Sequence, residues 1–353
     1  MKTLIKFSTM KLSEIKITPI MESLRLEDIS DKEYFGDHYA NYISNSRLAL
    51  LQMSPTNPTK FFEGLQANSK YADSLLFGSA VHELTLQPEN FFLCETVNRP
   101  TAKAGVMADK LYKKNGKMPS FEEMKQASLE VDYYANSWNS DKANALRGKC
   151  EGYWKARSKF ESELDDSREP IYLDEKNRIR LKSCLEALES NKNIQSLLHS
   201  DAEHKGNEKT ILLDVKVEAP GNEPFILRLK SKLDNYSIDP LTNTIVVNDV
   251  KTTGKLVSQF DDAIENFHYY REMAMYCFLL KLVANKFYGM EHPNIKSNFL
   301  VVETIPQYYT KVVPMTKGLF KKGMDEFSHL LKLVAFYCCD GNGHEGFREK
   351  FGA

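Results

Sequence analysis

The chain has 353 residues, of which 42% are hydrophobic and 27% are charged. This composition is ordinary for a globular protein, and the length is enough for one large domain or two smaller ones. The formal net charge of −1 excludes a protein that coats nucleic acid through overall basicity. It is compatible with an enzyme that binds a polyanion in a single positive groove.

Membrane and export signals are not found in the sequence. No apolar run approaches the roughly 18 residues that a membrane helix needs. Residues 1–21 have a basic start but neither a long apolar stretch nor a small-residue cleavage site, so we do not interpret them as a signal peptide. We therefore expect a cytoplasmic protein that does not contact a membrane.

The cysteines show no metal-binding or disulfide pattern. None of the six forms a C-x-x-C pair, and two of them are adjacent. A disulfide framework is not expected in a cytoplasmic chain of this length. We predict buried, reduced thiols at Cys94, Cys150, Cys184, Cys277, Cys338 and Cys339.

The first part of the chain reads as helical. Residues 1–35 show little periodicity and predict an arm or an edge element. Residues 42–65 predict a short helix followed by a proline-containing turn, with Ser44 or Ser46 as the N-cap. A second helix is predicted within 75–92.

A basic stretch follows at residues 99–117. It carries six lysines and arginines against the single acidic residue Asp109, and its glycines predict that part of it is a mobile loop. The stretch is either a solvated loop or an arm that grips phosphates. The second interpretation assigns phosphate contacts to Lys103, Lys110, Lys113 and Lys114.

After residue 206 the pattern changes from helices to strands. Residues 208–219, 225–236 and 242–253 are rich in β-branched or alternating apolar residues and are separated by turn signals, which predicts an antiparallel meander. The class is therefore α+β, with a central mixed sheet flanked by helices after a helical N-terminal half. The other predicted elements are helices at 121–165, 172–200, 262–286 and 317–338, and strands at 297–304 and 308–315.

One strand carries a chemical pattern. Side chains at i and i+2 of a strand share a face, so Asp249 and Lys251 project together. The preceding strand ends with Asp234, which a hairpin can bring near Asp249. Two converging carboxylates repel each other unless a cation lies between them, and oxygen ligands suit Mg²⁺ or Mn²⁺. Lys251 beside a metal can orient or deprotonate a water and stabilise a charged phosphate.

The pattern alone also fits a surface hairpin with an ion pair between Asp249 and Lys251, because D-x-K is common. Its context decides between the two interpretations. Asp234 followed by Asp249-Val250-Lys251 at the end of an apolar strand resembles the motif of the PD-(D/E)XK nuclease superfamily.

Upstream pieces resemble one branch of that superfamily, the RecE-like exonucleases (exonuclease VIII and its phage relatives). Residues 77–84, with 87–91 after them, resemble the G-x-A-x-H and P-E-x-F helix of the branch. Residues 208–213 begin with an acidic residue and are similar to the start of the strand before the metal hairpin in that branch. Residues 43–48 resemble the N-terminal helix of the branch. The resemblance runs from about residue 33 to 315.

The resemblance implies roles for five residues. Asp234 and Asp249 become ligands of Mg²⁺ or Mn²⁺, and Lys251 becomes the catalytic lysine. His82 becomes a further metal ligand or site residue, although a lone histidine on such a helix is otherwise a packed core residue. Glu208 becomes a catalytic-site residue, although an acidic residue at a strand's start is also a common solvated end.

Three positions depart from the family pattern. Leu233 replaces the proline that gives the motif its name, and the connection from Asp234 to Asp249 is long. Relatives typically carry a glutamine four residues before a tyrosine in the following helix, where this chain has Glu272 before Tyr276. We assign DNA contacts to Glu272 and Tyr276 on this basis, although tyrosines here are more often core residues.

The resemblance also implies an organisation. We expect a restriction-endonuclease-like core in one nuclease domain at 36–340. Its helical part spans 36–205, and its catalytic sheet with the flanking helices spans 206–340. An N-terminal arm at 1–35 and a C-terminal tail at 341–353 complete the chain.

The expected function is a Mg²⁺-dependent deoxyribonuclease, most specifically a 5′→3′ exonuclease on linear duplex DNA in recombination or phage DNA metabolism. The resemblance implies a homo-oligomeric ring, a single-strand annealing protein as partner, and a bacterial or phage-infected cell. Two alternatives stay open. One is a catalytically inactive DNA-binding module on the same fold, and the other is a single-strand trimming or repair nuclease.

Overall fold

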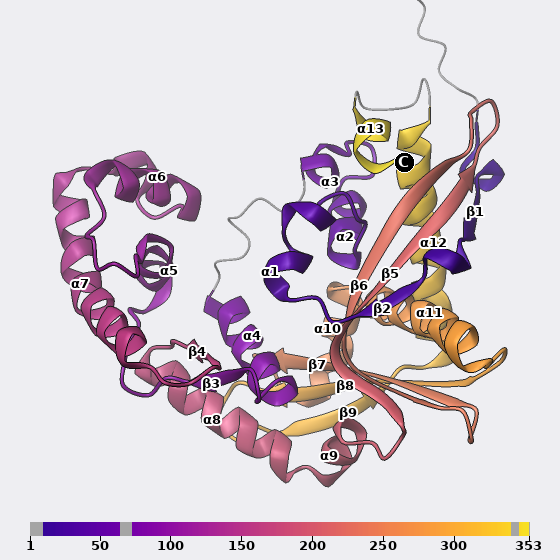
Figure 1. The fold of residues 1–353 in the computed structure, drawn as a ribbon. Helices are drawn as coiled ribbons and strands as arrows, with labels where there is room; N and C mark the ends of the chain where they lie inside the picture. Colours follow the sequence, from indigo (N-terminus) through magenta and orange to yellow (C-terminus); the bar gives the residue numbers. More distant parts are fainter. Residues whose placement is uncertain (1–9, 64–72, 340–345, 353) are drawn as a thin grey trace, which may run out of the picture.

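The computed structural model describes residues 10–63, 73–339 and 346–352 (Figure 1). It is an α+β structure in which helices flank a seven-stranded mixed sheet, as the sequence predicts. Residues 1–9 of the predicted arm, residues 64–65 of the predicted first helix and turn, and residues 341–345 and 353 of the predicted tail lie outside the described residues.

The sheet has the strand order β1-β5-β6-β7-β8-β9, and β2 also pairs with β5. The β7–β8 pair is parallel and the others are antiparallel. The strands are β1 (Lys16–Pro19), β2 (Arg25–Glu27), β5 (His204–Glu218), β6 (Phe225–Asp239), β7 (Thr244–Thr253), β8 (Asn294–Glu303) and β9 (Thr310–Pro314).

The three central strands form the predicted antiparallel meander. β5 and β6 each span 15 residues, and Leu213 lies opposite Leu229 in their register. β1 and β2 cover the free edge of β5, which confirms the predicted edge element within residues 1–35. Pairing of that edge satisfies backbone groups that would otherwise be open to another strand.

Helices cover both faces of the sheet (Figure 1). α11 (Tyr269–Tyr288) packs on one face, where Val247 of β7 joins a large apolar cluster with Met273. α4 (Asp73–Leu86) and α8 (Glu175–Ser190) pack on the other face, where Val250 joins a second cluster with Val81 and Leu181. The alternation along β7 therefore directs Asp249 and Lys251 to the α11 side.

The predicted helix 262–286 is wrong in one respect, because the structure divides it into α10 (Phe260–Asn266) and α11. His268 between them has a φ of 54°, which no α-helix accommodates. Its ring is held by Tyr270 and Glu326, at 2.5 Å and 3.2 Å from Nδ1. These side-chain contacts stabilise the break.

The basic stretch 99–117 contains a helix that was not predicted, α5 (Ala102–Leu111), and residues 112–117 after it lie outside any helix or strand, as predicted for part of the stretch. Val106, Met107 and Leu111 are buried in a separate apolar cluster with α6 (Phe121–Val131) and α7 (Ser140–Glu163). Lysines and glycines lie between the apolar residues of this stretch, so its apolar helix face is not apparent from the sequence. We call residues 102–163 the helical arm.

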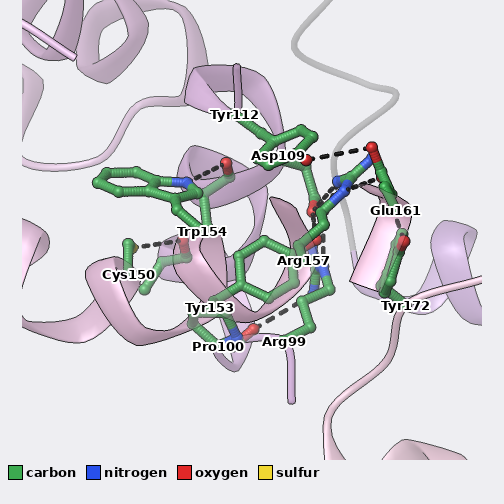
Figure 2. Close-up of polar contacts among 12 residues, drawn as sticks. Arg99, Pro100, Asp109, Tyr112, Cys150, Tyr153, Trp154, Arg157, Glu161 and Tyr172 are labelled. Carbon is green, nitrogen blue, oxygen red and sulfur yellow. Dashed lines mark hydrogen bonds and ion pairs between the residues drawn. The ribbon is translucent and has the colours of Figure 1, made fainter. Parts of the chain in front are cut away.

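A polar network fixes the helical arm to the segment before α8 (Figure 2). The guanidinium carbon of Arg157 lies 4.1 Å and 4.4 Å from the ring centres of Tyr112 and Tyr172. Arg157 Nε also lies 2.7 Å from Glu161, whose carboxylate accepts hydrogen bonds from both tyrosine hydroxyls. Cation–π and charge-assisted contacts of this kind hold the arm rigidly against the segment before α8.

The predicted helix cap and the predicted buried cysteines are both found in the structure. Ser44 is the N-cap of α2, and its hydroxyl accepts a hydrogen bond from Arg47 N at 3.3 Å. All six cysteines are buried and free, as predicted. No helix among the described residues is long and apolar enough to cross a membrane.

The remaining helices and strands are α1 (Asp31–Tyr34), α2 (Asn45–Met53), α3 (Thr59–Glu63), β3 (Phe91–Leu93), β4 (Glu169–Ile171), α9 (Lys192–Leu198), α12 (Lys317–Cys338) and α13 (Phe347–Phe351). The 3₁₀ turns are Leu12–Glu14, Met21–Ser23, Asp37–Tyr39, Ala135–Ser137 and Val257–Gln259.

The close crossing of α11 and α12 gives a first prediction. A Cβ added at Gly323 would lie 2.2 Å from the Tyr270 carbonyl oxygen and 2.7 Å from Ala274 Cβ. We expect Gly323→Ala to lower the free energy of unfolding by about 1–3 kcal/mol, because neither backbone nor Cβ can move aside cheaply. Urea unfolding measures the change.

Gly152 on α7 is the matched control, because nothing lies within 4 Å of a Cβ added there. Gly152→Ala should stabilise the protein by up to about 1 kcal/mol through helix propensity. Equal stability changes in the two variants would contradict the tight crossing.

Candidate metal centre

Three carboxylates form a row across β5, β6 and β7. The residues flanking Glu208 pair with those flanking Asp234, so these two carboxylates lie opposite each other. The β6–β7 ladder ends at Asn235 and Asn248, which places Asp234 opposite Asp249 one residue further on. We call Glu208, Asp234 and Asp249 the carboxylate row.

The strands separate where the row lies. Asp234 Oδ2 accepts a hydrogen bond from Val250 N at 2.8 Å, so a side chain takes the place of a ladder bond between β6 and β7. Glu208 has a φ of 52°, a left-handed conformation that is rare for a residue with a Cβ. Both features mark a local distortion of the sheet, of the kind that concentrates at functional sites.

An asparagine ladder fixes the register beside the row. Asn235 Nδ2 donates to Asn207 Oδ1 at 2.8 Å, Asn248 Nδ2 donates to Asn235 Oδ1 at 2.8 Å, and Asn298 Nδ2 donates to Asn248 Oδ1 at 2.9 Å. The ladder crosses β5 to β8. Asn235 and Asn248 are buried, so their amide partners hold the four strands in one alignment.

His82 completes the centre from α4. Its Nδ1 lies 3.3 Å from Asp234 Oδ2. Among the described residues, ligand atoms of His82, Glu208 and Asp234 all lie within 4.8 Å of one another. Burial, with the nearby charge of Lys251, lowers the pKa of His82 to about 4, so its imidazole is neutral at pH 7. A neutral imidazole is the form that binds a metal.

The donor chemistry of these residues fits a divalent cation. Carboxylates are ligands for Mg²⁺ and Mn²⁺, and an imidazole nitrogen favours the softer Mn²⁺ over Mg²⁺. Asp249 stands outside the group of ligand atoms that lie within 4.8 Å of one another. Its role as a metal ligand stays a prediction, as do the catalytic roles of Asp234, Lys251 and Glu208.

The carboxylate row is short of positive charge. Burial raises the pKa of Asp234 to about 6. Burial, and then the neighbouring Asp234, raises the pKa of Glu208 to about 8. The pKa of Asp249 is also raised to about 8 by burial and by Asp234, although Lys251 opposes this shift. A cation at the row would restore the ionised forms of all three.

Lys251 lies between two carboxylates. Its Nζ is 2.9 Å and 2.8 Å from the two oxygens of Asp249, and 3.2 Å from Glu272 Oε2. Burial acts against its charge, but Asp249, Glu272 and Asp234 outweigh it and hold the pKa of Lys251 well above its usual value. Lys251 is therefore an ammonium group fixed beside the row.

Glu272 and Tyr276 lie inside the centre. Glu272 comes from α11, and its Oε1 accepts a hydrogen bond from the Tyr276 hydroxyl at 3.2 Å. Burial works against the charged form of Glu272, but attraction to Lys251 prevails and lowers the pKa of its carboxyl. Tyr276 is 7% exposed, which fits the core interpretation of this helix. The DNA contacts assigned to both residues stay predictions.

Sequence reasoning missed Lys232 as a member of the centre. Its Nζ lies 3.1 Å from Glu208 Oε2, and it also pairs with Asp31 of α1. The spacing contained a signal, because Lys232 and Asp234 stand at i and i+2 of one strand and share a face.

Glu83 beside His82 was also missed. It lines a hollow with Glu208 and Asp234. Burial raises the pKa of Glu83 to about 7, and Asp31 and Glu169 add to the shift.

The predicted basic stretch contacts acidic residues of the same arm. The ammonium groups of Lys103, Lys110 and Lys113 each pair with a carboxylate that follows later in the sequence, and Lys114 is exposed. A phosphate role for these lysines stays a prediction. The partners of Lys103, Lys110 and Lys113 are Asp132, Glu130 and Glu123, respectively.

Comparison with known proteins gives little more. No family model matches the chain, and no curated protein matches it. Among solved structures, a protein from Eubacterium rectale described as a "Putative exonuclease" aligns at 12% identity over 65% of this chain and 79% of that chain, with a TM-score of 0.30. Similarity at this level carries no argument about activity, so the function must be argued from the site.

The carboxylate row predicts an unusual pH dependence of stability in metal-free protein. A carboxyl whose pKa is raised on folding stabilises the protein fully below its unfolded pKa of about 4 and loses that contribution as pH rises from there to the folded value. For Asp249 and Glu208 the folded value is about 8. We expect the free energy of unfolding, measured with urea in EDTA, to fall between about pH 6.5 and about pH 8 by at most about 1.4 kcal/mol per pH unit for each proton, and to level off above that range.

Asp249→Asn should make this slope shallower, because the amide has no proton to lose. His82 acts with the opposite sign only below its ordinary pKa, since its own folded pKa is lowered to about 4. Exposed Glu218 supplies the control variant, Glu218→Gln. An identical slope in wild type and Asp249→Asn would contradict the assignment.

Proposed function

We propose that this protein is a metal-dependent deoxyribonuclease that hydrolyses phosphodiester bonds in DNA. One observation carries the proposal: ligand atoms of His82, Glu208 and Asp234 converge within 4.8 Å, beside an ammonium group held at Asp249. Carboxylates held close together without a cation repel each other, which costs free energy. A fold that nevertheless holds them together therefore indicates a function.

The residues divide the chemistry among them. His82, Glu208 and Asp234 would hold Mg²⁺ or Mn²⁺, and Asp249, opposite Asp234 in the register, would join them. When bound, a divalent cation supplies Lewis-acid polarisation of the phosphate and activation of water. Lys251 places a fixed positive charge where negative charge develops on the phosphate.

Glu272 and Tyr276 position that charge. Glu272 contacts Lys251 at 3.2 Å, and the Tyr276 hydroxyl fixes the other oxygen of Glu272 at 3.2 Å. The ammonium group therefore has little freedom to leave the row.

The finer proposal follows the family resemblance of the sequence. We propose a RecE-like 5′→3′ exonuclease on linear duplex ends, whose single-stranded product is taken up by an annealing protein, and which assembles as a homo-oligomeric ring. Its support is the order and spacing of the motifs around residues 77–91, 208–213 and 249–253.

Nuclease activity on end-labelled linear duplex tests the proposal directly. Asp234→Asn, Asp249→Asn and Lys251→Gln are each expected to lower the rate at least about a hundredfold, because each removes a group that acts on the phosphate or the metal. EDTA should abolish the activity, and Mn²⁺ should restore it. Asp261→Asn, at an exposed position of α10, should cleave as wild type does.

A second candidate is a catalytically inactive DNA-binding module on the same fold. It is favoured by Glu272, which adds a second carboxylate to Lys251 where relatives carry a neutral glutamine. Activity equal in wild type and Asp249→Asn would support this module over the nuclease.

Metal titration separates the two candidates without an activity assay. In the nuclease, Mn²⁺ should bind wild type in isothermal calorimetry, and Glu208→Gln or His82→Gln should weaken binding at least about tenfold through loss of a ligand. Asp261→Asn is again the control. Heat of binding that is absent in wild type, or unaffected by both ligand variants, would argue for the inactive module.

A further inference from the structure

Four hollows follow one another across the molecule, each with lining residues in common with the next, and we call this series the track. The metal hollow, of about 370 Å³, contains the carboxylates of the centre and shares Thr252 with a hollow of about 600 Å³ beside α8. The α8 hollow shares Thr101 and Ala102 with an arm hollow of about 790 Å³. On the opposite side, the metal hollow shares Glu208 and Lys232 with a hollow of about 640 Å³.

The arm hollow combines aromatic rings with positive charge. Tyr133 and Tyr134 line it with their ring centres 4.6 Å apart, and Tyr134 is 50% exposed. Lys103 and exposed Lys149 line the same hollow. Lys142 Nζ lies 4.7 Å from the centre of the half-exposed Tyr134 ring, and Lys103 is paired with Asp132. The exposed part of this ring beside Lys149 provides a stacking surface for a base next to a charge for a phosphate.

The α8 hollow contains basic residues and the start of α5. Exposed Lys176 and partly buried Arg180 line it together with Asp174. Arg180 already donates to the Thr304 carbonyl oxygen and to Asn177, and the Asp174 carboxylate caps α8 by accepting a hydrogen bond from Asn177 N at 3.1 Å. α5 also begins here, and its N-cap Thr101 makes no side-chain hydrogen bond to the first turn. Backbone N–H groups of a first turn add to the attraction for anions.

The hollow beyond the metal centre has the opposite charge. Lys32 and Lys232 are its basic residues, and Lys232 is already paired with Glu208 and Asp31. A phosphate backbone is repelled there. Its acidic lining residues are Asp28, Asp31, Glu89, Glu169 and Glu208.

We propose that one DNA strand lies along this track, with a base on Tyr134 and phosphates at Lys149 and Lys176, and that the strand ends at the metal hollow. The acidic hollow beyond acts as a stop, so cleavage takes place at a strand end. The assignment rests on the proposed nuclease function. Both lysines lie outside the basic stretch 99–117 that the sequence indicates.

Binding in EDTA tests the track separately from cleavage. The probe is a fluorescein-labelled single-stranded oligothymidylate, followed by anisotropy at several salt concentrations. Lys149→Gln with Lys176→Gln should weaken binding about tenfold and reduce the salt slope by about 1.4, since each lost phosphate contact contributes about 0.7 for a single strand. Tyr134→Asn, which tolerates the left-handed φ of 56° at that position, should weaken binding about tenfold through lost stacking.

Lys321→Gln is the matched control, because this exposed lysine lies on α12 and lines none of the four hollows. It should leave both the affinity and the salt slope unchanged. Loss of binding in the control equal to that in the double variant, or wild-type affinity in the double variant, would overturn the track. Urea unfolding checks that each variant is folded.

Cleavage of circular and linear single strands tests the acidic stop. Wild type should cleave the linear strand at least about tenfold faster than the circle, and Glu89→Lys with Glu169→Lys should raise cleavage of the circle by removing the repulsion. Equal rates on both substrates in wild type, or no gain in the variant, would overturn the stop. No cleavage at all with normal binding would contradict the proposed nuclease function and still support the track.

Discussion

The asparagine ladder is the constraint on which the site depends. Each amide in the chain from Asn207 to Asn298 accepts or donates across a strand boundary, so a slip of any strand by one residue would leave buried amides without partners. The carboxylate row lies one residue away from Asn235 and Asn248. Holding the ladder in register therefore brings Asp234 opposite Asp249, and no hydrogen bond between the carboxylates themselves is needed.

Electrostatics then explains why the row is tolerated. A single ammonium group, Lys251, contacts both Asp249 and Glu272, and the other two members of the row rely on Lys232, on a backbone N–H and on protonation. The raised pKa values of Asp234 and Glu208 reflect this shortage of nearby positive charge. Stability is therefore lost locally, as is common where a fold holds charged groups together for a function.

Much of the sheet and part of the centre could be predicted from the sequence. Alternation along β7 placed Asp249 and Lys251 on one face, and turn residues gave the meander. The opposition of Glu208 and Asp234 could not be predicted, because register depends on amides from four strands. Helices at 121–165 were predicted, but α5 was not, for a related reason: Lys110 and Lys113 indicate a basic surface until α6 supplies their carboxylate partners.

The arm makes the net charge of −1 compatible with the DNA substrate that we propose. Its own apolar core and the Arg157 network hold the arm in place. Ion pairs within the arm neutralise lysines that could otherwise attract DNA to any part of its surface. What remains for the proposed DNA strand is the edge of the arm and α8, where Lys149 and Lys176 are exposed. Attraction on that side and repulsion beyond the metal centre together give the track a direction, which overall basicity could not supply.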